Sequence, residues 1–227
     1  MTEAKRNYSN ILSGLPVTLS SQLFARATRY RLAAGEALFR AGEEGDGCYR
    51  LDKGVLKVSM TSPQGDERTL AIMVPGSIVG ELAIIDGLPR SASVIAIKDC
   101  ELSFISRVAF NEYSQHHPEI YSYLVNVLAG RLRETNQAMA AASFLPIKAR
   151  VARTLLELAK YLGQEVGGGR ILIRHKINQG DLAAMTGVAR ENVSRILSKW
   201  KRQKIVTQSS FYYTISKLAA LERELES

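Results

Sequence analysis

The first half of the chain alternates between apolar and polar residues in short runs, and glycine-containing turns separate these runs. They occupy residues 66–74, 91–97 and 101–105, and residues 50–58 alternate in the same way around a turn at Gly54. Many short strands with frequent turns are typical of a sandwich or a jelly-roll barrel. We therefore predict an N-terminal β-barrel, preceded by a short helical region at roughly residues 9–28.

The period becomes helical from Arg107 onward, and Pro118 separates a first helix from a long one at residues 119–142. A mostly apolar stripe on the long helix alternates three- and four-residue steps, as a coiled-coil seam does: Val125, Leu128, Leu132, Thr135, Met139 and Ala142. A second stripe, Ile120, Leu124 and Val127, is placed to pack against the barrel. The spacing favours a dimerisation helix; an amphipathic helix packed only on its own domain is the alternative.

Residues 143–146 form the expected hinge, because the residue before a proline is biased out of the helical conformation. Beyond it the pattern predicts a helix at residues 147–162, a flexible turn at 167–169, a strand at 171–173, two helices within 178–202 around Gly187, and a hairpin at 205–215. These are the elements of a winged helix-turn-helix.

Charge separates the two parts of the chain. Residues 1–143 carry 15 Lys and Arg against 15 Asp and Glu, whereas residues 144–227 carry 15 against 7, so the net charge of +8 lies in the second part. A neutral part joined to a basic one fits a sensor domain followed by a domain that binds a polyanion. A solvated basic surface without a nucleic-acid partner is the alternative reading of charge alone.

Several classes of protein are disfavoured. No apolar run reaches the length of a membrane span, and the first 20 residues lack the pattern of a signal peptide. Cys48 and Cys100 lie far apart and form no CxxC pair, which argues against a disulfide framework and a thiolate metal site. We expect a cytoplasmic protein without a bound metal and without a membrane partner.

The two helices around Gly187 have the residues that a DNA-reading motif needs. Asn178 stands three positions before Asp181, the arrangement of a helix cap. Leu182, Met185, Val188, Val193, Ile196 and Leu197 supply the apolar contacts. Polar residues gather at the start of the second helix, where arginine can pair with guanine and glutamate with cytosine: Arg190, Glu191, Ser194 and Arg195. An exposed charged helix face of no special use is the alternative.

Residues 179–199, QGDLAAMTGVARENVSRILSK, closely resemble the helix-turn-helix of the catabolite-activator and fumarate-nitrate-regulator (CRP/FNR) family. The resemblance implies that Arg190, Glu191 and Arg195 read base edges in half-sites similar to TGTGA. It also implies DNA contacts by Asn192, Ser194 and Lys199. Ala189 and Gln179 depart from the family pattern, which often has a capping Ser or Thr at the first position and a phosphate-binding Arg at the second.

A second informative segment lies at residues 76–92. Gly80 allows a close approach of the backbone, and a short helix beginning near Glu81 offers free N–H groups to an anion. Arg90 can pair with a phosphate, and Glu81 can accept from hydroxyl groups such as those of a ribose. A buried Glu–Arg pair that braces the barrel is the alternative.

This segment resembles the phosphate-binding cassette of cyclic-nucleotide-binding domains, G-E-L-A…P-R-[ST]-A. The resemblance implies that Glu81 holds the ribose 2′-hydroxyl, and that Arg90, Ser91 and the backbone from Gly80 to Leu82 hold the cyclic phosphate. Leu70 and Ala71 would line the pocket. In the long helix, Thr135 would contact the purine within its own subunit and Asn136 would reach across the dimer.

Together the resemblances imply an α+β fold in three parts: a cyclic-nucleotide-binding jelly-roll domain (a double-stranded β-helix) at residues 1–118, a dimerisation helix at 119–143 and a winged helix-turn-helix at 144–227. They imply a homodimeric transcription regulator, not an enzyme, that a cyclic nucleotide switches allosterically. We expect cAMP rather than cGMP as the effector, and promoter DNA and RNA polymerase as partners.

Two alternatives remain at this point. A member of the same family with another effector, such as a cyclic dinucleotide, or with none, would have the same pattern, although the two cysteines are too few for an iron–sulfur cluster and the three histidines are poorly placed for haem. An enzyme acting on cyclic nucleotides would need a cluster of His and Asp metal ligands, which the sequence lacks.

Overall fold

The computed structural model describes residues 16–225, so the part of the expected N-terminal helix before Pro16 lies outside the described residues. The chain divides into two compact units between Thr135 and Asn136. This point falls inside the long helix, whose residues are therefore shared between the units. The division of function at residues 118/119 and 143/144 stays a prediction.

The first unit is built on a six-stranded antiparallel sheet. Its strands are β1 (Thr28–Leu32), β2 (Ala37–Phe39), β3 (Gly47–Thr61), β4 (Glu67–Met73), β5 (Ile78–Val79) and β6 (Ser93–Ser106). The order is β1-β6-β3-β4, with β2 paired to β6 and β5 paired to β3. The two long strands β3 and β6 therefore form the centre of the sheet, and the core between its layers contains Leu51, Leu56 and Leu102.

Two expectations about these strands were wrong. Gly54 does not end a strand in a turn; it lies within β3, where the register with β6 shifts. Its φ of +100° and the closeness of Asp99 and Cys100, which a Cβ would overlap, explain the glycine at this bulge. The expected separate strands at residues 91–97 and 101–105 are one continuous strand, β6.

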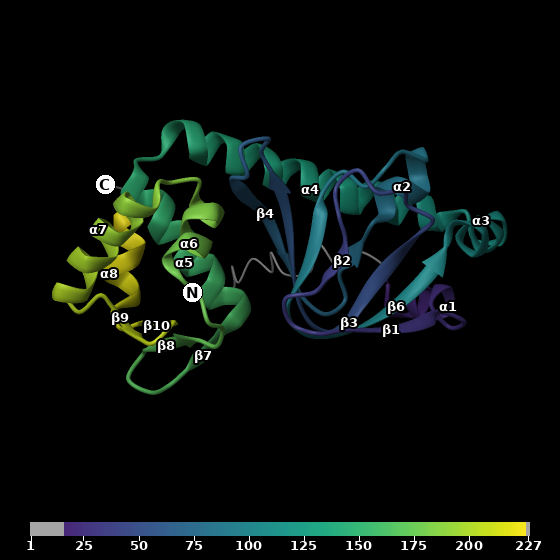
Figure 1. The fold of residues 1–227 in the computed structure, drawn as a ribbon. Helices are drawn as coiled ribbons and strands as arrows, with labels where there is room; N and C mark the ends of the chain where they lie inside the picture. The colour runs from purple at the N-terminus through teal and green to yellow at the C-terminus, as the bar shows by residue number, and fades with distance from the viewer. Residues whose placement is uncertain (1–15, 226–227) are drawn as a thin grey trace. The chain divides into compact units, whose positions relative to one another are not determined.

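Within the described residues, four helices accompany the sheet. They are α1 (Val17–Leu23), α2 (Glu81–Asp86), α3 (Arg107–His116) and α4 (Glu119–Phe144), labelled in Figure 1. Ile120, Leu124 and Val127 of α4 are buried, and the first two pack in a cluster with Cys48 and Ile105 of the sheet, which confirms the inner stripe of the long helix. The other stripe stays largely exposed: Val125, Leu132 and Met139 are 62%, 61% and 66% exposed.

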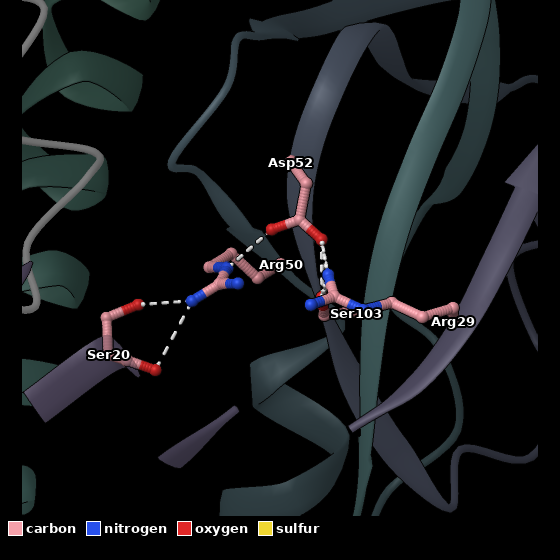
Figure 2. A network of polar contacts seen from close by, with 5 residues as sticks. All are labelled: Ser20, Arg29, Arg50, Asp52 and Ser103. Carbon is pink, nitrogen blue, oxygen red and sulfur yellow. Dashed lines mark hydrogen bonds and ion pairs between the residues drawn. The ribbon is translucent and has the colours of Figure 1, made fainter. Parts of the chain in front are cut away.

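A polar network fastens α1 to the sheet (Figure 2). Asp52 of β3 accepts hydrogen bonds from Arg50 Nε and Arg29 Nη1, both at 2.7 Å, and a further one from the Ser103 hydroxyl of β6. Arg50 also donates to the carbonyl and the hydroxyl oxygens of Ser20 in α1, at 3.3 and 3.1 Å. One carboxylate thus connects α1 with β1, β3 and β6. The helix ends at Leu23, earlier than expected, and Thr28 already begins β1.

The second unit contains α5 (Ile147–Leu162), α6 (Gln179–Thr186), α7 (Arg190–Arg202), α8 (Leu218–Glu222) and the 3-10 helix η2 (Arg223–Leu225). A small antiparallel sheet has the order β7-β8-β10-β9, with β7 (Gly163–Glu165), β8 (Ile171–Ile173), β9 (Val206–Ser209) and β10 (Tyr212–Ile215). The expected helices, the strand at 171–173 and the hairpin are confirmed. The sequence reading missed β7, α8 and η2.

Taken together, a β-sheet domain, several helices and a C-terminal helix-turn-helix confirm the expected α+β class. No helix among residues 16–225 is long and apolar enough to cross a membrane.

Candidate functional site

The first unit encloses a cavity of about 440 Å³, a size in the usual range for a site that binds a small molecule. Strands of the sheet, the helix α2 and one face of α4 line it. Its walls are mostly apolar: Phe39, Val58, Leu70, Ala71, Met73, Val79, Leu82, Ala83, Ala92, Val94, Leu128 and Leu132. The polar lining residues are Glu81, Arg90, Ser91, Arg131, Glu134 and Thr135, together with Gly80.

Arg90 is a buried cation without a carboxylate partner. Only 6% of it is exposed, and within residues 16–225 no acidic side chain forms an ion pair with it. Its Nη1 donates to the carbonyl oxygens of Gly47 at 2.8 Å and Gly80 at 2.9 Å, and its guanidinium lies over the Phe39 ring at 4.3 Å. Arg90 Nε is buried and has no hydrogen-bond partner among the described residues. A buried charge is costly unless it is paired, so this position favours an anion.

Gly80 makes room for this guanidinium. It precedes α2 with a φ of +82°, and a Cβ at this position would overlap Arg90 Nη1. A Cβ at Gly45 would meet Arg90 as well, 2.9 Å from Cζ. Gly80, the first residue of the G-E-L-A motif, therefore allows the Arg90 guanidinium to lie close to the backbone.

Glu81 is buried at 3% exposure, and its two oxygens differ. Oε1 forms an ion pair with Arg131 Nη1 of α4, while Oε2 is buried and has no hydrogen-bond partner in the described chain. Arg131 also donates to the carbonyl oxygen of Ile78. The buried Glu–Arg pair considered as an alternative thus exists, but with Arg131 in place of Arg90, and it leaves one carboxylate oxygen available.

The structure brings together nearly all the residues expected to bind a ligand. Leu70, Ala71, Gly80, Glu81, Leu82, Arg90, Ser91 and Thr135 all line the cavity. Asn136 is not among its lining residues, and its expected contact across a dimer stays a prediction. The sequence reading missed Arg131 and Leu128, although Arg131 precedes Thr135 by one helical turn and therefore shares its helix face.

The Cys48 thiol near this site is unreactive. Cys48 is buried in the core, and this burial, together with the nearby Glu81, raises the pKa of its thiol well above the ordinary value. It is therefore a protonated core residue rather than a nucleophile. Within residues 16–225 no group of three or more His, Cys, Asp or Glu side chains could hold a metal ion.

The helix-turn-helix of the second unit has the expected local signals. Asn178 Oδ1 accepts from the Asp181 N–H at 2.9 Å, and Asp181 Oδ2 accepts from the Asn178 N–H at 2.8 Å, which is a complete capping box on α6. Gly187 ends α6 in the left-handed conformation with a φ of +60°. Ala189 precedes α7 and provides no side-chain cap, as the departure from the family pattern led us to expect.

The face of α7 that was expected to read DNA is available. Val193 and Leu197 are buried toward the domain, together with Trp200, whereas the expected base-reading arginines are exposed. The full set of expected DNA contacts comprises the exposed Arg190, Glu191, Arg195 and Lys199 and the half-buried Asn192 and Ser194. Arg195 Nη1 lies 3.5 Å from Asn192 Oδ1. Arg195 is otherwise directed at solvent, which suits a residue that pairs with a base.

Known proteins match both units. Residues 29–117 match the family model of the cyclic nucleotide-binding domain, and residues 149–224 match that of the Crp-like helix-turn-helix domain. The chain is 36% identical to a CRP-like cAMP-activated global transcriptional regulator of Mycobacterium tuberculosis, over 72% of this chain and 73% of the relative. It is 32% identical to a cyclic AMP receptor protein of Thermus thermophilus, over 83% of each chain.

Solved structures show the same fold. A CRP/FNR-family transcriptional regulator of Thermus thermophilus superposes with a TM-score of 0.76 at 25% identity, covering 88% of this chain and 99% of the other. The c-di-GMP responsive global regulator CLP of Xanthomonas campestris also has a TM-score of 0.76, at 22% identity and with the same coverage.

The Glu81–Arg131 pair generates a prediction about stability. Arg131→Met leaves the Glu81 carboxylate buried without a partner, so we expect the free energy of unfolding to fall by about 3 kcal/mol. Urea denaturation monitored by circular dichroism measures it. The double variant Glu81→Gln/Arg131→Met removes the unpaired charge and should recover most of the loss.

Lys53→Met is the matched control, because the Lys53–Glu101 pair is largely exposed at 3.6 Å and contributes little. A double variant as unstable as Arg131→Met alone would contradict the assigned pairing.

Proposed function

Because the chain belongs to the CRP/FNR family of DNA-binding transcription regulators, which are not enzymes, we propose that a cyclic nucleotide, cAMP, binds the cavity of the first unit and controls the binding of promoter DNA by the second. Such a regulator works in the cytoplasm, where RNA polymerase is its second partner at the promoter.

The observation that carries the choice of ligand is that two buried charged side chains in one apolar cavity are incompletely paired. Arg90 has no acidic partner, and Glu81 Oε2 has no donor, among the residues that the structure describes. A ligand that satisfies both must supply an anion and a hydroxyl donor a short distance apart. A cyclic mononucleotide has both, because its phosphate carries one negative charge and its ribose keeps the 2′-hydroxyl.

The remaining lining residues suit the rest of such a ligand. We propose that Ser91 and the backbone from Gly80 to Leu82, which line the cavity, make further phosphate contacts and that Leu70 and Ala71 supply apolar surface. We propose that Thr135 contacts the purine within its subunit and that Asn136 does so from the partner subunit. The names of the relatives from Mycobacterium tuberculosis and Thermus thermophilus support cAMP as the nucleotide.

The exposed stripe of α4 supports a homodimer with two-fold symmetry. Its apolar members Val125, Leu132 and Met139 have a heptad spacing and are more than half exposed in the single chain. Two copies of the recognition helix would then reach half-sites about 34 Å apart, one turn of DNA. We propose that these half-sites resemble TGTGA, with Arg190, Glu191 and Arg195 reading base edges and Asn192, Ser194 and Lys199 adding contacts.

The nucleotide acts on DNA binding through the protein and does not touch the DNA, because every residue of the cavity belongs to the first unit and the recognition helix to the second. A ligand shifts such an equilibrium only by its differential affinity for the two states. Linkage then requires promoter DNA to tighten nucleotide binding by the same factor by which the nucleotide tightens DNA binding.

The first prediction concerns the phosphate. Arg90→Leu removes a charged hydrogen-bond donor, so cAMP should bind about tenfold more weakly or worse. Isothermal titration with cAMP, cGMP and cyclic di-GMP measures the affinities and identifies the preferred effector. Arg40→Leu, which changes an exposed arginine outside the lining of the cavity, is the control and should bind as the parent does. Unchanged cAMP affinity in Arg90→Leu would place the phosphate elsewhere.

A second prediction concerns the dimer. Val125→Glu puts a charge on the apolar stripe of α4, so sedimentation velocity should show the parent as a dimer and this variant as a monomer at the same concentration. Asn126→Glu alters the neighbouring exposed residue outside the stripe and should remain dimeric. A monomeric parent would rule out the proposed seam.

A third prediction concerns base reading. Arg195→Ala should weaken binding to the preferred duplex by about 1–3 kcal/mol and relax selectivity at one base pair of each half-site. Fluorescence anisotropy with single-base variants of the duplex measures both effects. Arg202→Ala, an exposed arginine in the last turn of the same helix, controls for charge, since any loss should be equal for all sequences. Equal losses for all sequences in Arg195→Ala would mean that this arginine reads no base.

A further inference from the structure

The turn that leads into the recognition helix α7 is fastened to the first turn of α5. Arg150 of α5 donates from Nε and Nη2 to the Thr186 carbonyl oxygen, at 3.1 and 2.6 Å, and from Nη2 to the Gly187 carbonyl oxygen at 2.6 Å. These carbonyls end α6 and form the turn that leads into α7. Thr186 is buried, and its hydroxyl donates to the Leu182 carbonyl oxygen at 2.7 Å. One guanidinium therefore fixes the turn, and its charge also suits the carboxyl end of a helix.

The end of α7 is fastened to the same turn of α5 through the C-terminal segment. Trp200 lies fully buried in the last part of α7, and its indole Nε1 donates to Glu224 Oε1 at 3.3 Å. Glu224 Oε2 forms an ion pair with Lys148 Nζ, and the Glu224 side chain is only 12% exposed. Glu224 belongs to η2, beyond the hairpin, in a segment that played no part in the sequence-based assignment of function.

We propose that Arg150 and Glu224 are positioning residues for DNA recognition, which hold both ends of α7 on the first turn of α5. The proposal rests on the DNA-binding function proposed above and extends it to residues that belong neither to the cavity nor to the expected base-reading set. Lys148 and Arg150 follow Pro146 closely, and only Leu145 and Pro146 separate α5 from the end of α4. The two anchoring residues of α5 therefore lie within a few residues of the junction with α4.

Two conservative variants test the positioning role, because each keeps the approximate size of the side chain and removes a specific interaction. Arg150→Lys keeps the charge but loses the planar fork that bridges two carbonyl oxygens. Glu224→Gln keeps an oxygen that can accept from Trp200 but loses the charge that attracts Lys148. Glu157→Gln is the control, because it makes the same acid-to-amide change in α5, where Glu157 pairs with Arg153 at 2.9 Å on an exposed surface.

The first measurement is the affinity for a duplex that the parent protein selects from a random DNA pool, at saturating cAMP and at a temperature where circular dichroism shows every variant folded. Arg150→Lys and Glu224→Gln should each bind about tenfold more weakly, because each loses hydrogen bonds or an ion pair that involves a charged group. Glu157→Gln should match the parent. Parent-like affinity in both variants would overturn the proposal.

A second measurement needs neither DNA nor nucleotide. Trp200 is the single tryptophan of the chain, so its emission reports on this anchor alone. Acrylamide should quench it more efficiently in Glu224→Gln than in the parent and in Glu157→Gln, since the end of α7 becomes looser. Equal quenching in all three proteins would show that Glu224 does not anchor α7. A parent that selects no duplex would instead refute the proposed function, and the quenching result would still decide the anchoring.

Discussion

The burial of the Arg90 guanidinium, which has no acidic partner among residues 16–225, is the constraint on which the first unit depends. Two backbone carbonyls and the face of Phe39 stabilise it, and Gly45 and Gly80 leave the space that a Cβ would occupy. These groups hold the cation in place, so the proposed binding of an anion would not require the guanidinium to be ordered first.

Glu81 connects this constraint with the long helix. Its ion pair with Arg131 joins the cassette to α4, the same helix that carries the exposed apolar stripe, and Leu128, Leu132 and Thr135 of that stripe also line the cavity. A ligand hydroxyl that binds the second oxygen of Glu81 would change the electrostatic surroundings of Arg131 directly. The cavity and the proposed dimer seam thus share one helix. A change in the contacts of the cavity would therefore act on the same helix that forms the seam.

The second unit is under a different constraint, since its recognition helix must expose one face and stay rigid. Val193, Leu197 and Trp200 bury the inner face of α7, Arg150 binds the turn that precedes it, and Glu224 accepts a hydrogen bond from Trp200 near its end. This buried face anchors α7 in the domain, while the polar side chains at its start remain exposed.

The sequence by itself determined most of the helices and the positions of the two motifs, because periodicity, caps and turn glycines act over a few residues. The capping box at Asn178, the αL turn at Gly187 and the inner stripe of α4 are local signals of this kind. Tertiary structure alone decided that Glu81 pairs with Arg131, 50 residues away, and not with Arg90. It also decided that Gly54 makes a bulge and that Glu224 reaches Trp200. Such pairings depend on which distant segments the folded core brings together, and no spacing along the chain records that.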